Sequence, residues 1–297
     1  MGDGRFAHRS LTVSPEASTG ILDPLRDASK NDGDATQWSA TVLLDGTSPT
    51  VLDDLDGDLI LPTASIGKLF LLLTVLDEID EGRLDPAEVL DVTDDDQVAD
   101  SGLLQFLDEQ STPVLDLCRF VGAVSDNLAT NMLIRRVGLD RIDELTRRLG
   151  IASCRLHDTV RDVRTADEPP YLSTGSSAEL ADLARRLQIG DAISPTVSEA
   201  LVELLRLNTD LSMVAAAFGL DPLAHADEDI GIGLRLFNKT GTQTGTRADV
   251  GCVETTVVGE WRVVSYAIIA RFDDSPSMRR NVLGAMRAVG ERIAAQL

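Results

Sequence analysis

Lysine is scarce in this sequence. Among its 27 lysine and arginine residues, only Lys30, Lys68 and Lys239 are lysines. The chain therefore uses arginine wherever any cation would serve. A desolvated lysine can lose its proton whereas an arginine cannot. We therefore expect Lys68 and Lys239 to occupy positions where the chemistry needs an amine.

The sequence also lacks export and membrane signals. No run of about 18 apolar residues occurs, so no membrane-spanning helix is expected. Residues 1–18 contain no apolar core of a signal peptide. The small, odd number of cysteines (Cys118, Cys154 and Cys252) fits reduced thiols. These absences favour a cytoplasmic location.

Patterns for metal and polyanion binding are missing as well. The three histidines, His8, His157 and His225, are scattered, and no CxxC pair occurs. We therefore expect neither a metal nor another cofactor. The net charge of −22 would repel nucleic acid and anionic membrane surfaces, so neither is an expected partner of this acidic protein.

The hydrophobic pattern predicts strands near the N-terminus and helices after them. Apolar and β-branched residues predict a strand over residues 38–44 and a shorter strand following it. A strongly apolar helix is predicted from Ser65 to Gly82, and we expect it to be buried. Residues 84–206 are predicted to be mostly helical.

The last third of the chain predicts three consecutive strands and a closing amphipathic helix. This order predicts an α+β fold in which both chain ends build one antiparallel sheet. We expect residues 1–62 and 208–297 to form the sheet domain and residues 63–207 to form an inserted helical domain. A junction between two such domains is a common place for an active site.

Ser65 and Lys68 form the first candidate site motif, Ser65-Ile66-Gly67-Lys68. Residues three apart share one face of a helix, so the Lys68 amine can reach the Ser65 hydroxyl. A serine hydroxyl is a weak nucleophile until a base takes its proton, and burial could lower the lysine pKa enough for that role. Taken alone, the motif also fits a serine that caps a helix beside an incidental lysine.

Two further motifs follow along the chain. Ser125-Asp126-Asn127 precedes a predicted helix and, taken alone, also fits an ordinary capping sequence. Lys239-Thr240-Gly241 ends a predicted strand, whose alternation places Lys239 and Gly241 on one face. Gly241 would let a substrate lie against the strand edge, although an edge lysine before a turn would look the same.

Taken together, the three motifs resemble the S-x-x-K, S-D-N and K-T-G signature of class A β-lactamases and penicillin-binding proteins. The spacing of 60 residues between Ser65 and Ser125 matches the class A enzymes. The similarity extends over residues 38–297. It implies a β-lactamase/transpeptidase-like fold, with a five-stranded antiparallel sheet flanked by terminal helices. It also implies a small-molecule partner, namely a β-lactam or a D-Ala-like amide or ester.

The resemblance implies four catalytic residues. Ser65 would attack the carbonyl and become acylated, with Lys68 as the proton acceptor. Ser125 would pass a proton to the departing nitrogen, and Lys239 would tune Ser125 electrostatically.

The resemblance also implies a substrate-binding set. The backbone N–H groups of Ser65 and Thr242 would form the oxyanion hole. Asn127 would donate its amide to a substrate carbonyl. Thr240 and Arg247 would hold the substrate carboxylate, although Arg247 also fits an ordinary surface arginine.

The sequence departs from the class A pattern at the deacylation step. In class A enzymes a loop glutamate activates the deacylating water, and counting from Ser125 places that role near Val160 and Arg161. Glu168 is a possible substitute base, or else a solvated loop carboxylate. Without a positioned base, hydrolysis of the acyl enzyme would be slow. The favoured expectation is a β-lactamase-type hydrolase; a slowly deacylating peptidase-like or esterase-like enzyme and a non-catalytic homologue remain open.

Overall fold

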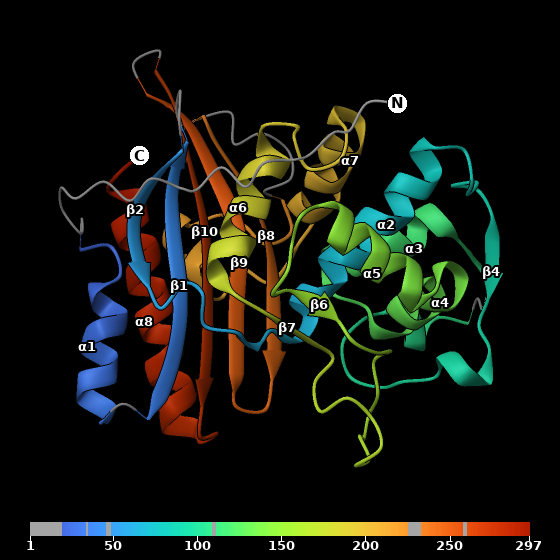
Figure 1. Cartoon of the computed structure of the whole chain (residues 1–297), viewed down its shortest axis with the longest axis horizontal. Coiled ribbons are helices and arrows are strands. Elements are labelled where there is room, and N and C mark those ends of the chain that lie inside the picture. Colours follow the sequence, from blue (N-terminus) through green and yellow to red (C-terminus); the bar gives the residue numbers. More distant parts are fainter. Residues whose placement is uncertain (1–19, 34, 46–48, 109–110, 225–232, 258–259) are drawn as a thin grey trace.

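A sheet made from both ends of the chain forms one half of the protein in a computed structural model (Figure 1). The structure describes residues 20–33, 35–45, 49–108, 111–224, 233–257 and 260–297. The sheet has the order β2-β1-β10-β9-β8. Every neighbouring pair in it is antiparallel. Its strands are β1 (Thr36–Asp45), β2 (Thr50–Leu55), β8 (Leu234–Gln243), β9 (Thr246–Val257) and β10 (Glu260–Phe272).

Residues of opposite parity on β10 enter two different hydrophobic cores. Tyr266 and Ile268 pack with α1 (Asp23–Asp32) and α8 (Pro276–Ala294) on one face of the sheet. Ala267 and Ile269 belong to the other core, which includes apolar residues of α6 (Ser177–Gln188). This alternation is the period of two that a β-strand imposes. The predicted antiparallel sheet with flanking terminal helices is therefore confirmed.

The remaining helices gather on the other side of edge strand β8, at the right of Figure 1. They are α2 (Lys68–Asp80), α3 (Val114–Val124), α4 (Asn127–Val137), α5 (Leu139–Arg148) and α7 (Pro195–Arg206). Helix α6 falls within the range 63–207 predicted as a helical domain, yet it packs against β1, β9 and β10 of the sheet. The domain limits stay a prediction.

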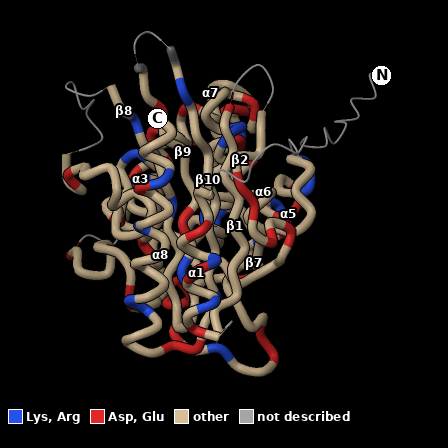
Figure 2. Tube along the Cα trace, turned by 90° about the vertical axis from the view of Figure 1, so that its left-hand side faces the viewer, with Lys and Arg blue, Asp and Glu red and all other residues tan. Residues whose placement is uncertain are grey.

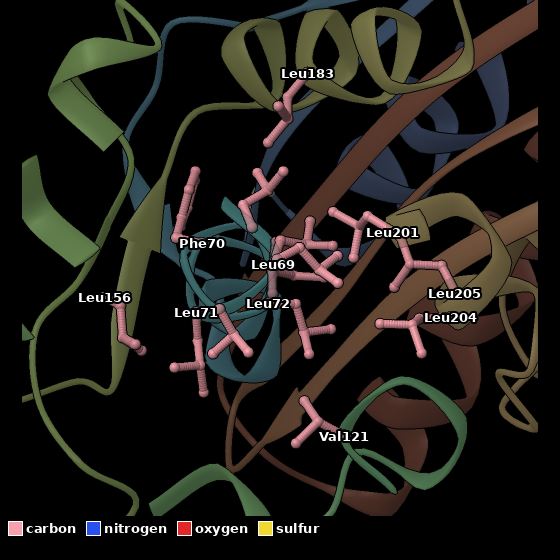
Figure 3. Packing of buried hydrophobic residues seen from close by; sticks show 14 of the residues in the cluster. Leu69, Phe70, Leu71, Leu72, Val121, Leu156, Leu183, Leu201, Leu204 and Leu205 are labelled. Atoms are coloured by element: carbon pink, nitrogen blue, oxygen red, sulfur yellow. The ribbon is translucent and has the colours of Figure 1, made fainter. Parts of the chain in front are cut away.

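Helix α2 runs through the centre of the helical part (Figure 3). Its residues from Lys68 to Asp77 are all buried. Leu69 and Leu72 lie among leucines of α7 and near Val121 of α3. Burying one such side chain stabilises the fold by about 1.5–3 kcal/mol, so this helix is held firmly at Lys68, where the first site motif ends.

The expected start of this helix was wrong in detail. The helix predicted from Ser65 begins as a separate 3₁₀ turn, η1 (Ala64–Gly67), and α2 starts only at Lys68. Ser65 is therefore inside a tight turn and does not cap an α-helix.

The predicted helical stretch 84–206 also contains short strands. A run of two or three residues has no detectable periodicity, which explains why the sequence did not indicate them. These strands and the short strand β3 before η1 form two small sheets. The elements are β3 (Leu61–Pro62), β4 (Val89–Asp91), β5 (Ser111–Pro113), β6 (Arg155–Leu156) and β7 (Ser173–Gly175).

Acidic and basic residues are interspersed along the elements in Figure 2. Many arginines pair with carboxylates: buried Asp77, for example, lies within 4 Å of Arg83, Arg141 and Arg148. Among the described helices, none combines the length and the apolar character needed to cross a membrane.

Candidate active site

The first motif lies in a strained turn packed against the sheet. Ala64 has a left-handed backbone with φ 50°, which is unfavourable for a residue that carries a Cβ. Ser65 follows it, partly exposed, and its side chain makes no hydrogen bond to any residue that the structure describes. Turn η1 contacts edge strand β8. The candidate nucleophile is thus placed where the sheet meets the helices.

The amine of Lys68 connects the first motif to the second. Its Nζ donates to the Ser125 carbonyl oxygen at 2.6 Å and to Asn127 Oδ1 at 2.8 Å. It also lies 3.3 Å from Ser125 Oγ. The side chain is completely buried, so these contacts replace water around the amine.

Ser125 is held at this point by the junction of two helices. Helix α3 ends with Ser125 in a left-handed conformation, with φ 55°. Asp126 then caps α4 by accepting from the backbone N–H of Ala129 at 3.0 Å. The same carboxylate accepts from the N–H groups of Leu103 and Leu104. Cap and strain together turn the Ser125 hydroxyl away from the helix axis and toward the amines.

The third motif reaches the same hydroxyl from the sheet. Lys239 Nζ donates to Ser125 Oγ at 3.1 Å and to the carbonyl oxygen of Thr240 at 2.9 Å. A Cβ at Gly241 would lie 2.2 Å from the Thr63 carbonyl oxygen, so only glycine permits this approach of β8 to η1. Strand β8 therefore brings Lys239 and the turn that carries Ser65 together.

Burial sets the protonation of the two amines. It lowers the pKa of Lys68 well below its usual value, and the charge on Lys239 lowers it further, while Asp126 opposes the change. Burial also lowers the pKa of Lys239, to about 8, with Asp210 and Asp249 opposing. These shifts favour the uncharged form of Lys68, whereas a pKa of about 8 keeps Lys239 mostly charged near neutral pH.

The predicted carboxylate-binding residues share one face of β8 and β9. Thr242 pairs directly with Arg247, and Thr240 pairs with Asp249 two positions along. The Arg247 guanidinium donates to the carbonyl oxygens of Gln243 and Thr246 at 3.0 and 2.6 Å, which holds it at the turn between the strands. The role of Arg247 stays a prediction.

Glu168 is engaged elsewhere. Its carboxylate accepts from the Thr165 N–H at 2.7 Å and pairs with Arg161 at 3.0 Å. No contact joins it to the three motifs among the residues that the structure describes. Its proposed role as the deacylation base therefore has no support from the geometry.

Asn131 binds the loop at Val160, one of the two positions near which the spacing from Ser125 predicts the class A glutamate. Its side chain donates to the Val160 carbonyl oxygen at 3.0 Å and accepts from the Val160 N–H at 2.8 Å. The sequence reasoning did not identify Asn131, although a buried amide on α4 is a signal that could have indicated it. Asn131 therefore fixes Val160, one of the two positions at which the class A pattern predicts a glutamate.

The three cysteines and His157 lie outside this cluster. Cys118, Cys154 and Cys252 are free and buried, and burial raises the pKa of each thiol. His157 contacts the Thr174 hydroxyl at 2.8 Å. His8 and His225 lie outside the described residues.

Comparisons with known proteins point in one direction. A model of the β-lactamase enzyme family matches residues 23–293. A β-lactamase of Streptomyces albus G is 28% identical over 159 residues, which are 51% of this chain and 51% of that protein. The chain thus matches about half the length of this curated relative.

Solved structures are similar over nearly the whole chain. A β-lactamase from Sphaerobacter thermophilus has a TM-score of 0.78 at 21% identity and covers 95% of this chain and 98% of its own. PBP-A has a TM-score of 0.76 at 20% identity, with 96% and 100% covered. An ancestral class A β-lactamase (GNCA) has a TM-score of 0.75 at 23% identity, with 93% and 100% covered. Such identities show the fold alone, and they confirm the predicted fold class.

Proposed function

Because the chain belongs to the β-lactamase enzyme family, we propose that it is a serine acyl enzyme that reacts with β-lactams or related small amides and esters at Ser65. One observation carries the proposal: the Ser125 hydroxyl lies 3.3 Å and 3.1 Å from the buried amines of Lys68 and Lys239, and Lys68 directly follows the turn that holds Ser65. Burying two lysines costs stability because burial disfavours their charged forms, so finding both at one hydroxyl points to a chemical role.

Acylation would begin with proton removal from Ser65. Lys68, whose uncharged form is favoured by burial, takes the hydroxyl proton as Ser65 Oγ attacks the carbonyl carbon. The carbonyl oxygen gains negative charge, and the backbone N–H groups of Ser65 and Thr242 stabilise it. The C–N bond then breaks, and the nitrogen takes a proton from Ser125 Oγ.

The contacts of Ser125 suit this relay. Its hydroxyl can recover a proton from Lys68, whose Nζ is 3.3 Å away and carries the proton taken from Ser65. Charged Lys239, whose Nζ is 3.1 Å away, stabilises negative charge on the same oxygen. One proton thus travels from Ser65 to the leaving nitrogen with no net change in the enzyme.

The substrate would be held at two ends. Thr240 and Arg247 lie on one face of the hairpin, where they suit a carboxylate. Asn127 accepts from the Lys68 amine through Oδ1. One N–H of its amide donates to the Ala99 carbonyl oxygen at 3.0 Å, which leaves the second N–H for a substrate carbonyl.

A second candidate function follows from Val160. Its backbone is clamped by Asn131, and its side chain packs partly buried against the larger hydrophobic core. An apolar side chain cannot take a proton from the water that would hydrolyse the acyl enzyme. This favours slow deacylation, as in a peptidase-like or esterase-like acyl enzyme, over rapid β-lactam hydrolysis.

One experiment distinguishes these functions. The protein is incubated with a chromogenic cephalosporin while colour and intact mass are followed. Sustained colour release without an adduct supports a β-lactamase, and a persistent adduct supports a slowly deacylating enzyme. Ser65→Ala is the control and should give neither signal. No reaction with any acylating probe would contradict the proposal and favour a non-catalytic homologue.

We also infer a cytoplasmic location. Three buried free cysteines suit a reducing compartment. Fractionation of cells that produce the full chain would check this, and recovery outside the cytoplasm would contradict it.

A further inference from the structure

Ser173 lies directly beneath the turn that carries Ser65. Strand β7, which begins at Ser173, pairs with β3 just before that turn. The Thr63 N–H donates to the Ser173 carbonyl oxygen at 3.1 Å, which extends the pairing by one residue. The Ser173 side chain is completely buried. A Cβ at Gly67 would lie 2.5 Å from Ser173 Cβ, so the fit here is tight.

The Ser173 hydroxyl is the middle member of a chain of hydrogen bonds. It donates to the Ala64 carbonyl oxygen at 2.5 Å. It also lies 2.7 Å from the Thr63 hydroxyl. A hydroxyl has one proton to donate, and Ser173 gives it to Ala64, so Thr63 must be the donor in the other bond. The order is therefore Thr63 to Ser173 to the Ala64 carbonyl.

That carbonyl shares a peptide group with the backbone N–H of Ser65. A trans peptide is planar, and its C=O and N–H point in opposite directions. A hydrogen bond that fixes the Ala64 oxygen therefore fixes the direction of the Ser65 N–H as well. Ala64 needs such support, because its left-handed backbone persists only where the surroundings determine it.

We infer that Ser173 is a positioning residue, which aims and polarises the Ser65 N–H as an oxyanion donor through the Ala64 peptide. This inference rests on the proposed function. The chain of donors strengthens the effect, because each hydrogen bond polarises the next and makes the terminal N–H a better donor. Thr63 acts indirectly, because its hydroxyl donates to Ser173 and not to the Ala64 carbonyl oxygen.

The test compares matched variants. Ser173→Ala removes the hydroxyl that holds the Ala64 oxygen, and Thr63→Val keeps the shape of Thr63 but removes its proton. Ser177→Ala is the control: Ser177 is equally buried and hydrogen-bonded to Ser39 and Thr41, but it does not contact the turn. Acylation rate by penicillin G and the infrared carbonyl frequency of the acyl enzyme are measured for each, together with thermal unfolding.

The expected result separates positioning from stability. Removing an oxyanion donor outright costs about 10²–10³ in rate, so weakening one through Ser173→Ala should slow acylation about tenfold. The ester carbonyl frequency should rise, because a weaker oxyanion hole polarises that bond less. Thr63→Val should shift both values in the same direction by less, while Ser177→Ala should change thermal unfolding only.

Two results would overturn the inference, and they are distinguishable. If the wild-type chain is acylated, and Ser173→Ala and Thr63→Val leave the rate and the carbonyl frequency unchanged, Ser173 has no positioning role although the proposed function stands. If the wild-type chain is not acylated at all, the proposed function fails and the inference fails with it.

Discussion

Lys239 Nζ lies 3.1 Å from Ser125 Oγ, and Lys68 Nζ lies 3.3 Å from the same oxygen. Both amines are fully buried, and burial lowers both pKa values. The proposed acylation needs the two lysines in different protonation states. Lys68 must be neutral to accept a proton, whereas Lys239 must be charged to stabilise the Ser125 oxygen. This difference gives acylation a defined pH dependence.

Acylation should fall on the alkaline side with an apparent pKa of about 8. That value belongs to Lys239, which is charged below it and loses its charge as the pH rises through it. The acidic limb reflects Lys68, which loses its function as base when it gains a proton at low pH. Second-order acylation rates with penicillin G, measured from pH 5 to about 10, would show the profile.

The variant Lys239→Arg tests whether Lys239 causes the alkaline fall of the acylation rate. Lys239→Arg keeps its charge at every accessible pH, so the fall near pH 8 should move upward by more than one unit or disappear. Lys30→Arg is the control, because Lys30 is exposed on α1 and pairs with Asp27, away from the three motifs. An alkaline limb that stays in place in Lys239→Arg would show that another group sets it.

Lys68→Arg should slow acylation by about 10²–10⁴ at neutral pH, because a guanidinium does not lose its proton and so cannot take one from Ser65. Rapid mixing with penicillin G and intact mass spectrometry would give the rate of adduct formation. Lys30→Arg again provides the matched control. Adduct formation by Lys68→Arg at the wild-type rate would remove Lys68 from the proposed mechanism.

Val160→Glu should accelerate deacylation. Asn131 binds both backbone groups of Val160, so a carboxylate introduced there would be held in a fixed place on the loop. A positioned general base typically contributes about 10²–10⁴ in rate, and the lifetime of the penicillin adduct should shorten accordingly.

Val163→Glu is the matched control for this change. It places the same charge on the same loop, but Val163 is 78% exposed. Its adduct should persist as long as that of the wild-type chain. If Val160→Glu does not shorten the adduct lifetime, position 160 does not face the acyl group.

From the sequence, the residues that form the candidate site were easier to predict than the contacts these residues make. Scarcity singled out Lys68 and Lys239, because an arginine-rich chain has little reason to bury an amine. Hydrophobic periodicity predicted the sheet and the buried helix, since long elements repeat their pattern several times. The Thr63–Ser173 contact joins residues 110 positions apart through strands too short to show any period, so no local pattern could indicate it.

Two glycines should respond in opposite ways to substitution by alanine. At Gly241 a Cβ would meet the Thr63 carbonyl oxygen at 2.2 Å, so β8 or the turn that carries Ser65 must move. We expect Gly241→Ala to slow acylation at least about tenfold and to destabilise the fold by about 1–3 kcal/mol, the usual cost of overpacking. At Gly284, within α8, a Cβ would meet nothing within 4 Å.

Gly284→Ala should therefore stabilise the fold by about 0.5–1 kcal/mol, because alanine loses less backbone entropy in a helix than glycine does. Its acylation rate should match that of the wild-type chain. Urea unfolding and the rate of penicillin adduct formation, measured side by side for both variants, would check the pair. In Gly241→Ala, the steric conflict with the Thr63 carbonyl oxygen can be relieved only if β8 or the Ser65 turn moves. Acylation at the wild-type rate by this variant would therefore mean that the reaction does not require the close approach of β8 to that turn.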